Sequence, residues 1–389
     1  MKKFLGLSLI IFLFINCSKK ETQQINRFVV DERSVSKVAK EKLADKVKLQ
    51  LLPIETTDSS LLDLSSIQIR FDGDTIVMYD YSVNQFFLFD RKGQFIRNID
   101  RRGQGPEEYL YGIWYKAKNG KLYVVDRDHI KIYDYNGNYL GNFEADNTRM
   151  GEIAVTDKDD VYIKAPYSFS YQLNALNKEG EVIWEALPSN KKMMNSQSPR
   201  GPEYHGIGEI GENIFVTVPM DQNIYLVKDT TMTVLASFDF GSDNIPDDFF
   251  DQDAEAVNNE FWDRRNQTNG KSGFVYFDYL FIDDNWILFN PVSNKLTKMV
   301  LADRRTGETY GFEAFPDVLQ KLMRRHKYIS EYDMTTGSFI ISLSADKLKE
   351  DLEELKKEGN LKSFPELMLI DTDKINEEDN GFLLMIHLE

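Results

Sequence analysis

The pentapeptide Phe89-Asp90-Arg91-Lys92-Gly93 recurs twice further along the chain, as Tyr133-Asp134-Tyr135-Asn136-Gly137 and Leu176-Asn177-Lys178-Glu179-Gly180. Each copy has an apolar or aromatic residue before Asp or Asn, and a glycine three residues after that polar residue. The three glycines lie 44 and 43 residues apart, and a related copy with a longer turn ends at Gly307. We expect each glycine to adopt the positive φ of a tight hairpin turn between two strands.

The three copies lie within a larger pattern of six strand-like runs, each preceded by residues that favour turns. The runs are residues 75–80, 121–126, 160–165, 213–218, 285–290 and 338–343. Repeats of about 44 residues with several short strands are typical of β-propellers, in which each sheet buries its two apolar faces against neighbouring sheets. The sequence therefore predicts an all-β fold, a six-bladed β-propeller with helical insertions between blades.

A propeller must close its ring, because an open ring would expose unpaired strand edges. We expect residues 46–54 to supply the outer strand of the last blade, beside residues 382–388, so that residues 46–389 form the propeller. Residues 247–266 and 346–358 lie in longer insertions and have the apolar spacing of helices. These helices are expected either to cap the ring or to wall a pocket on one face of it.

The composition excludes several classes of protein. The 389 residues carry a formal net charge of −16, which argues against nucleic acid or an anionic membrane surface as the main partner. The single cysteine excludes an internal disulfide and a multi-cysteine metal cluster. The high content of strand-forming aromatic residues, 13% of the chain, is typical of a folded β protein.

No motif in the sequence defines a cofactor site or a catalytic site. Residues 206–211 match the glycine spacing of dinucleotide-binding loops, but a strand-like run follows them where that site needs a helix. The four histidines lack the spacing of zinc ligands. We therefore expect no cofactor, no metal and no catalytic residues that the sequence can name. Carboxylates from distant blades could still meet around the ring axis.

The N-terminus has the pattern of an export signal. Lys2 and Lys3 precede twelve nearly all apolar residues, Phe4 to Ile15, a run too short to cross the roughly 30 Å of a bilayer core. The run ends near Cys17, the only cysteine, which is similar to the acylated cysteine of bacterial lipoproteins. Residues 1–17 are thus predicted as a lipoprotein signal and residues 18–45 as a polar tether of an outer-membrane lipoprotein, facing the periplasm or the surface. An ordinary secretory signal with a chance cysteine is the alternative.

One glycine-rich segment lies between the first two predicted blades: Arg101-Arg102-Gly103-Gln104-Gly105-Pro106-Glu107-Glu108-Tyr109. A shorter echo, Arg200-Gly201-Pro202-Glu203-Tyr204, follows about two blades later. Both are explained structurally as rigid crossovers between blades. Functionally, they could ring the mouth of the channel beside aromatic residues that stack on a sugar or a peptide side chain. The candidate ligand-binding residues are Arg101, Arg102, Glu107, Tyr109, Trp114, Tyr115, Arg200 and Tyr204.

Four stretches resemble landmarks of one protein family: Ile54-Glu55-Thr56-Thr57, the pentapeptide at 89–93, residues 103–109 and Glu378-Asp379-Asn380-Gly381. The family is the six-bladed β-propeller lipoproteins of Gram-negative bacteria, which are similar in fold to TolB-like and NHL-like propellers. Gly381 departs from the pattern, because relatives usually carry proline there. The resemblance implies the fold and an envelope location, but no catalytic residues.

The expected function is therefore binding rather than catalysis. The predicted protein is a lipid-anchored envelope propeller that binds a saccharide, a peptide or an envelope protein at one face of the ring, with the membrane reached only through the lipid anchor. The alternatives are a propeller hydrolase or lyase acting on a saccharide, and a purely structural scaffold. Convergence of two or three carboxylates in the channel would favour the enzyme.

Overall fold

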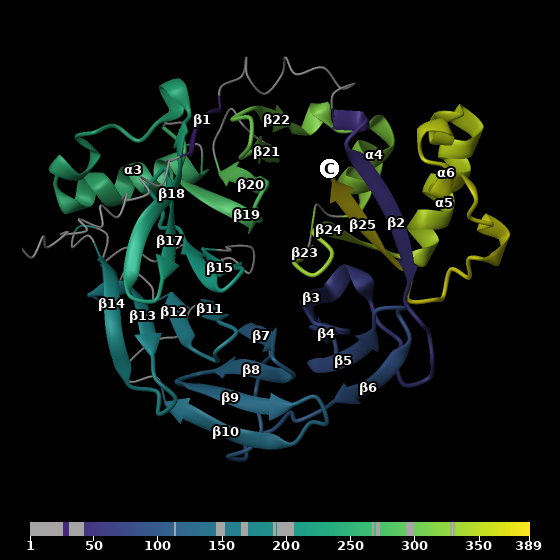
Figure 1. Ribbon diagram of the computed structural model, residues 1–389, viewed down its shortest axis with the longest axis horizontal. Helices are drawn as coiled ribbons and strands as arrows, with labels where there is room; N and C mark the ends of the chain where they lie inside the picture. The colour runs from purple at the N-terminus through teal and green to yellow at the C-terminus, as the bar shows by residue number, and fades with distance from the viewer. Residues whose placement is uncertain are drawn as a thin grey trace, which may run out of the picture.

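The described residues form six β-sheets arranged around a common axis, which confirms the predicted six-bladed β-propeller (Figure 1). The computed structural model describes residues 26–30, 43–112, 114–144, 152–164, 170–189, 192, 206–266, 268–269, 273–292, 299–326, 329 and 331–389. In each blade the first strand lies nearest the axis, and the inner strands of blades 6 and 1, 1 and 2, 2 and 3, and 3 and 4 contact one another.

Blades 1 to 5 are antiparallel sheets whose four strands follow one another in sequence. Blade 1 contains β3 (Ile67–Asp72), β4 (Thr75–Asp80), β5 (Gln85–Asp90) and β6 (Phe95–Ile99). Blade 2 contains β7 (Trp114–Lys118), β8 (Lys121–Asp126), β9 (His129–Asp134) and β10 (Tyr139–Glu144). Blade 3 contains β11 (Glu152–Val155), β12 (Val161–Lys164), β13 (Tyr171–Leu176) and β14 (Val182–Pro188). Blade 4 contains β15 (Ile207–Ile210), β16 (Asn213–Val216), β17 (Asn223–Lys228) and β18 (Thr231–Asp239). Blade 5 contains β19 (Tyr276–Ile282), β20 (Trp286–Val292), β21 (Val300–Asp303) and β22 (Thr309–Gly311).

Blade 6 combines strands from both ends of the sequence. It contains β23 (Glu331–Asp333), β24 (Ser338–Leu343) and β25 (Phe382–Leu388), with β2 (Val47–Pro53) as the outer strand. Strands β2 and β25 are antiparallel, with Val47 opposite Leu388 and Pro53 opposite Phe382. Backbone hydrogen bonds between these distant segments therefore close the ring.

Residues 26–30, which the sequence places in a polar tether, instead belong to the folded ring. Strand β1 (Asn26–Val29) pairs in parallel with β18 and adds a fifth strand to the outer edge of blade 4. The side chain of Phe28 is buried, and its ring lies 5.1 Å from that of Phe238. Leu43, near the other end of the predicted tether, is also buried. Four residues among polar neighbours are too few to show a clear alternation, so this strand has no recognisable pattern in the sequence.

The repeated pentapeptide forms the turn between the third strand and the outer strand of its blade. In the first copy, Asp90 Oδ1 accepts hydrogen bonds from two backbone amides of the turn, at 2.8 and 2.9 Å. Gly93, Gly137 and Gly180 have φ values of +75°, +81° and +84°, which confirms the expected positive φ. A Cβ on Gly93 would lie 1.9 Å from the carbonyl oxygen of Pro53. Glycine thus also allows the turn of blade 1 to pack against blade 6.

The insertions hold most of the helices of the described chain. The α-helices are α3 (Ala254–Asn266), α4 (Asp317–Arg325), α5 (Ala345–Glu358) and α6 (Pro365–Met368). The 3-10 helices are η1 (Leu64–Ser66), η2 (Gly241–Asp243), η3 (Phe249–Asp251), η4 (Phe312–Ala314), η5 (Asn360–Ser363) and η6 (Thr372–Lys374). The predicted helix at 346–358 coincides with α5, whereas only the second part of 247–266 is α-helical.

The helices beside blade 6 extend the core of the propeller outward. Leu319 of α4, Leu348 and Leu352 of α5 and Leu367 of α6 are buried in one apolar cluster with strand residues of blades 5 and 6. Figure 1 shows α5 and α6 on the outer side of β2, away from the ring axis. These helices cap the rim of the ring, and they contribute no side chain to the central cavities described below.

Candidate functional site

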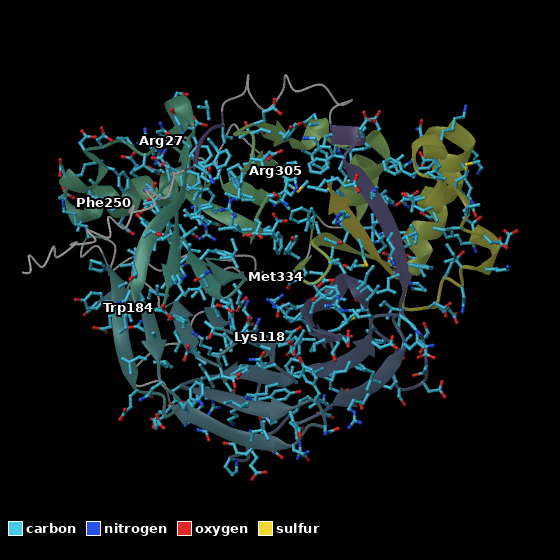
Figure 2. All side chains as sticks on the ribbon, viewed as in Figure 1. Arg27, Lys118, Trp184, Phe250, Arg305 and Met334 are labelled. Atoms are coloured by element: carbon cyan, nitrogen blue, oxygen red, sulfur yellow. The ribbon has the colours of Figure 1, made fainter. Side chains whose placement is uncertain are left out.

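The candidate site is the central channel, where the inner strands of the blades converge. A cavity of about 160 Å³ lies there, bordered by residues from or next to β3, β7, β15, β19 and β23. We call it the wide cavity. Figure 2 shows Lys118 and Met334 at the centre of the ring, and both side chains border the wide cavity. A ligand reaching this space would contact five of the six blades at once.

The walls of the wide cavity differ in chemistry. Its charged wall comes from β3, β7 and β15, together with the first residue of β23; these residues are Arg70, Asp72, Lys116, Lys118, Glu209 and Glu331. Its apolar wall comes mainly from blades 4 to 6 and includes Phe215, Leu280, Phe281, Ile282 and Met334. The cavity can therefore hold a polar group on one side and an apolar group on the other.

The alternation of β7 explains why its two lysines face the cavity. Tyr115 and Ala117 point into the apolar core shared by blades 1 and 2. Successive side chains of a strand point to opposite sides. Lys116 and Lys118 therefore share the other side of β7 with Trp114, which packs against the core between blades 2 and 3.

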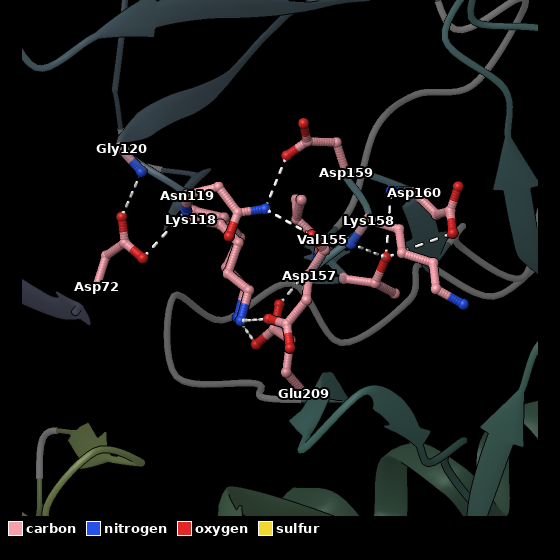
Figure 3. A network of polar contacts seen from close by, with 12 residues as sticks. Asp72, Lys118, Asn119, Gly120, Val155, Asp157, Lys158, Asp159, Asp160 and Glu209 are labelled. Atoms are coloured by element: carbon pink, nitrogen blue, oxygen red, sulfur yellow. Dashed lines mark hydrogen bonds and ion pairs between the residues drawn. The ribbon is translucent and has the colours of Figure 1, made fainter.

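The charges of the channel form ion pairs between blades. Arg70 of blade 1 donates a hydrogen bond to Glu331 of blade 6. Lys116 Nζ lies 3.0 Å from Glu209 Oε2, so this pair joins blades 2 and 4. Figure 3 shows Glu209 together with Lys118, whose ammonium lies 2.5 Å from Asp157. Two of these pairs join adjacent blades, and the Lys116–Glu209 pair joins two blades that are not adjacent.

The environment of Glu209 favours its ionised form. Burial by itself would raise the pKa of this carboxyl, but Lys116, the Val155 amide at 2.9 Å and Lys118 together hold the pKa below its usual value. Glu209 therefore stays negatively charged at neutral pH and serves as the internal counter-ion of the lysines.

A second, smaller cavity of about 30 Å³ adjoins the wide cavity and shares Arg70 and Lys116 with it. Glu152 borders it and lies opposite Lys164 in the β11–β12 pairing. Burial raises the pKa of Glu152 to about 7 and lowers the pKa of Lys164 to about 7. The Gly206 amide donates to Glu152 Oε2 at 2.6 Å. Burial thus disfavours the carboxylate form of Glu152 and the ammonium form of Lys164, the forms that these residues usually have at neutral pH.

The structure separates the residues that the sequence predicts as a binding site. Arg101, Arg102 and Glu107 are exposed on the crossover between β6 and β7. Arg101 donates to the Gly137 carbonyl at 2.8 Å, and Arg102 pairs with Asp100 at 2.7 Å. Arg101 thus attaches the crossover to a turn of blade 2, whereas the Arg102–Asp100 pair lies within the crossover itself.

The aromatic residues of the predicted site pack into the protein. Tyr109 is fully buried, and its hydroxyl lies 3.3 Å from the Asn84 carbonyl. Tyr115 is buried and donates to the Gln68 carbonyl at 2.9 Å. Trp114 borders the smaller cavity beside Tyr115. Arg200 and Tyr204 lie outside the described residues, and so does Cys17.

The charged side chains of the wide cavity were missed by the sequence reasoning. The signal was present in the inner strands, where Trp114, Lys116 and Lys118 alternate with Tyr115 and Ala117. Charged residues at every second position of a strand that is buried on its other side point to an aqueous channel. Ion pairing between blades could not be predicted, because it depends on how the blades stack.

Two features are absent from the described residues. No helix among them is long and apolar enough to span a membrane. No group of three or more His, Cys, Asp or Glu side chains among them is placed to hold a metal ion.

Six blades around a charged central channel define this protein as a six-bladed β-propeller. Residues 26–387 match the model of DUF4934, a domain of unknown function, and the chain therefore belongs to this family.

Two solved structures are similar to this chain. A protein described as exported, from Bacteroides fragilis NCTC 9343, is similar over 94% of this chain and 99% of its own, with a TM-score of 0.71 and 20% identity. A member of the DUF4221 family from Bacteroides vulgatus is similar over 89% of this chain and 99% of its own, with a TM-score of 0.48 and 9% identity. No curated protein matches the sequence.

Proposed function

We infer that this protein is a lipid-anchored propeller of the cell envelope that binds a ligand, or a segment of a partner, in its central channel. The observation that carries this inference is the wide cavity, with a charged wall and an apolar wall. Ligand pockets usually combine an apolar lining with a few fixed polar groups. A saccharide, a peptide or a segment of an envelope protein could present both kinds of group.

The state of the channel carboxylates favours binding over catalysis. Glu209 is paired with Lys116 and Glu331 with Arg70, so both carboxylates already have a cationic partner within the protein. Glu152 has a pKa of about 7, which suits acid–base chemistry, but it borders only the smaller cavity of about 30 Å³. That volume accommodates little more than one water molecule. A saccharide hydrolase or lyase would need room for a sugar ring beside such a group.

The test of the binding function is a ligand panel with a variant that narrows the channel. The side chain of Met334 is 44% exposed at the wall of the wide cavity, so Met334→Trp adds bulk there without forcing it into the core. We expect at least one saccharide or peptide to raise the Tm of the native protein by a few degrees at saturating concentration. The same ligand should leave the Tm of Met334→Trp unchanged.

The matched control for this test is Met368→Trp. Met368 is exposed on α6, away from the ring axis. The ligand should therefore raise the Tm of Met368→Trp as it raises the Tm of the native protein. A flat response of the native protein across a broad panel would favour the scaffold function. A ligand that shifts native and Met334→Trp proteins equally would bind outside the channel.

The envelope location is supported by the export-like N-terminus and by the likeness to an exported protein. Cys17→Ala is expected to move the protein from the membrane fraction to the soluble fraction, since acyl chains on the cysteine would supply the anchor. Fractionation of the native host with immunodetection measures this, and Ser18→Ala is the control. A membrane fraction that Cys17→Ala leaves unchanged would contradict the lipid anchor.

A further inference from the structure

The carboxylates that border the wide cavity are already engaged within the protein. Glu209 accepts from the Val155 amide through Oε1 and from Lys116 through Oε2. Glu331 accepts from the Tyr332 amide through Oε1 and from Arg70 through Oε2. Few acceptor positions of these two side chains therefore remain for a ligand.

Asp72, the third carboxylate of the wide cavity, is engaged in the same way. Its Oδ1 accepts from the Asn119 amide at 3.0 Å, and its Oδ2 accepts from the Gly120 amide and the Tyr135 hydroxyl, each at 2.7 Å. These bonds hold the turns of blades 1 and 2 together, as Figure 3 shows for the two amides. Asp72 thus stabilises the packing of these turns at the edge of the cavity.

The two lysines of the same wall, Lys116 and Lys118, have more N–H donors than these contacts use. Each lysine ammonium carries three N–H donors. Lys116 contacts Glu209 at 3.0 Å, and Lys118 contacts Asp157 at 2.5 Å. The Asp157 side chain is 52% exposed, so water weakens its hold on Lys118. The wall therefore offers a ligand N–H donors and positive charge, and it favours a ligand that brings acceptors and negative charge.

The size of the wide cavity and its apolar wall restrict the rest of the ligand. About 160 Å³ is close to the volume at which an apolar cavity holds one benzene ring. Phe281 and Met334 belong to the apolar wall. They come from blades 5 and 6, whereas both lysines come from blade 2. An apolar group the size of one side chain would bury against them while its charged group reaches blade 2.

Building on the channel-binding function inferred above, we propose that the wide cavity binds a carboxylate on an apolar body of about one aromatic side chain, with its oxygens accepting from Lys116 and Lys118. Two sources carry this chemistry: a free small aromatic or aliphatic acid, and the C-terminal residue of a peptide. Uronic acids carry the carboxylate but have a polar body, and they are expected to bind less well.

The experiment is calorimetric titration of the full protein with four probes: phenylacetate, phenylacetamide, glucuronate and a tripeptide ending in a free phenylalanine carboxylate. Phenylacetate should bind, and phenylacetamide should bind about ten-fold more weakly or not at all, because a hydrogen bond to a charged group contributes about 1.5–3 kcal/mol and about 1.4 kcal/mol is ten-fold in affinity. Equal affinity for phenylacetate and phenylacetamide would overturn the proposal.

The variants for the same titration are Lys118→Gln and Lys116→Gln, with Lys121→Gln as the control. Lys121 pairs with Asp159 at 2.6 Å and does not border the wide cavity, so its variant should bind phenylacetate as the native protein does. Lys118→Gln should weaken binding about ten-fold. Its partner Asp157 is half-exposed, so this variant should fold even if Lys116→Gln, which leaves Glu209 without its partner, does not. Unchanged affinity in Lys118→Gln would count against the proposal.

The remaining probes distinguish a peptide C-terminus from a free acid. Together with the ligand panel, they also distinguish carboxylate binding from binding of another ligand in the channel. Tighter binding of the tripeptide than of phenylacetate would identify a peptide C-terminus, and equal or weaker binding would identify a free acid. Glucuronate that binds as tightly as phenylacetate would contradict the apolar body. If no carboxylate binds but another ligand raises the Tm in a manner that Met334→Trp abolishes, the carboxylate proposal is wrong and the channel-binding function stands.

Discussion

Asn380→Asp is expected to lower the free energy of unfolding by about 3 kcal/mol or more, because each buried hydrogen-bonding group left unsatisfied costs about 1–3 kcal/mol. Asn380 is buried where the ring closes. Its Nδ2 donates to the Glu55 carbonyl at 2.8 Å and to the Ser60 carbonyl at 2.6 Å, and its Oδ1 accepts from the Leu62 amide at 2.7 Å. Asp keeps the shape but replaces the donor with a second carboxylate oxygen, which faces two carbonyls.

Urea unfolding of the native and variant proteins measures this effect. Asn376→Asp is the matched control: Asn376 lies in the same loop and is exposed, so its change is expected to stay within about 0.5 kcal/mol. Equal urea midpoints for the native protein and Asn380→Asp would show that Asn380 does not hold the closure.

The same contacts explain why two stretches of the resemblance occur together. Asn380 contacts the segment that follows β2, and the Ile54 amide donates to the Gly381 carbonyl at 3.0 Å. Gly381 has a φ of +95°, which proline cannot adopt. The backbone conformation of this turn therefore excludes proline at position 381.

Phe28→Ala is expected to remove about 3–5 kcal/mol of local stability, the usual cost of truncating a buried phenylalanine to alanine. Phe28 is 1% exposed in the apolar cluster between blades 4 and 5. Because β1 is an added edge strand, the loss should appear mainly as detachment of β1 from β18 rather than as unfolding of the ring.

Hydrogen exchange of the backbone amides of β1 is the suitable measurement. Phe28→Ala should speed exchange there by orders of magnitude while leaving the amides of β4 unchanged. Val29→Ala is the control, since the Val29 side chain is 53% exposed and its truncation should have little effect. Slow exchange in β1 of Phe28→Ala would mean that the backbone pairing alone holds the strand.

The sequence predicted the fold well because the pattern of one strand per blade is strong. All six strand-like runs coincide with or overlap the second strand of a blade: β4, β8, β12, β16, β20 and β24. A second strand has a paired neighbour on each side and a blade against each face, so it is apolar throughout, as in β4, where five of six residues are buried. The outer strands, such as β14, are more exposed and less distinct in sequence.

The candidate site was harder to predict for a geometric reason. The notable residues of the sequence, such as Tyr109 and the glycines around it, stabilise a crossover. Within this motif Glu108 Oε2 accepts from the Gly105 amide at 2.9 Å, and it lies 1.7 Å from where a Cβ on Gly103 would be. The channel residues, Arg70 and Lys116 among them, come from separate blades and meet only when the ring is formed. No local sequence pattern therefore predicts which of these residues lie close together in the ring.

The closing pair of blade 6 has a consequence for folding during synthesis. Strand β2 precedes the four consecutive strands of each of blades 1 to 5, whereas its partner β25 is the last strand of the chain. Until β25 has been made, β2 lacks its pairing partner and the sixth sheet has an open edge. Contacts between residues so far apart in sequence form slowly, and exposed edges promote aggregation in the meantime. Chaperone protection of the nascent chain would matter most in the interval before its final strand emerges.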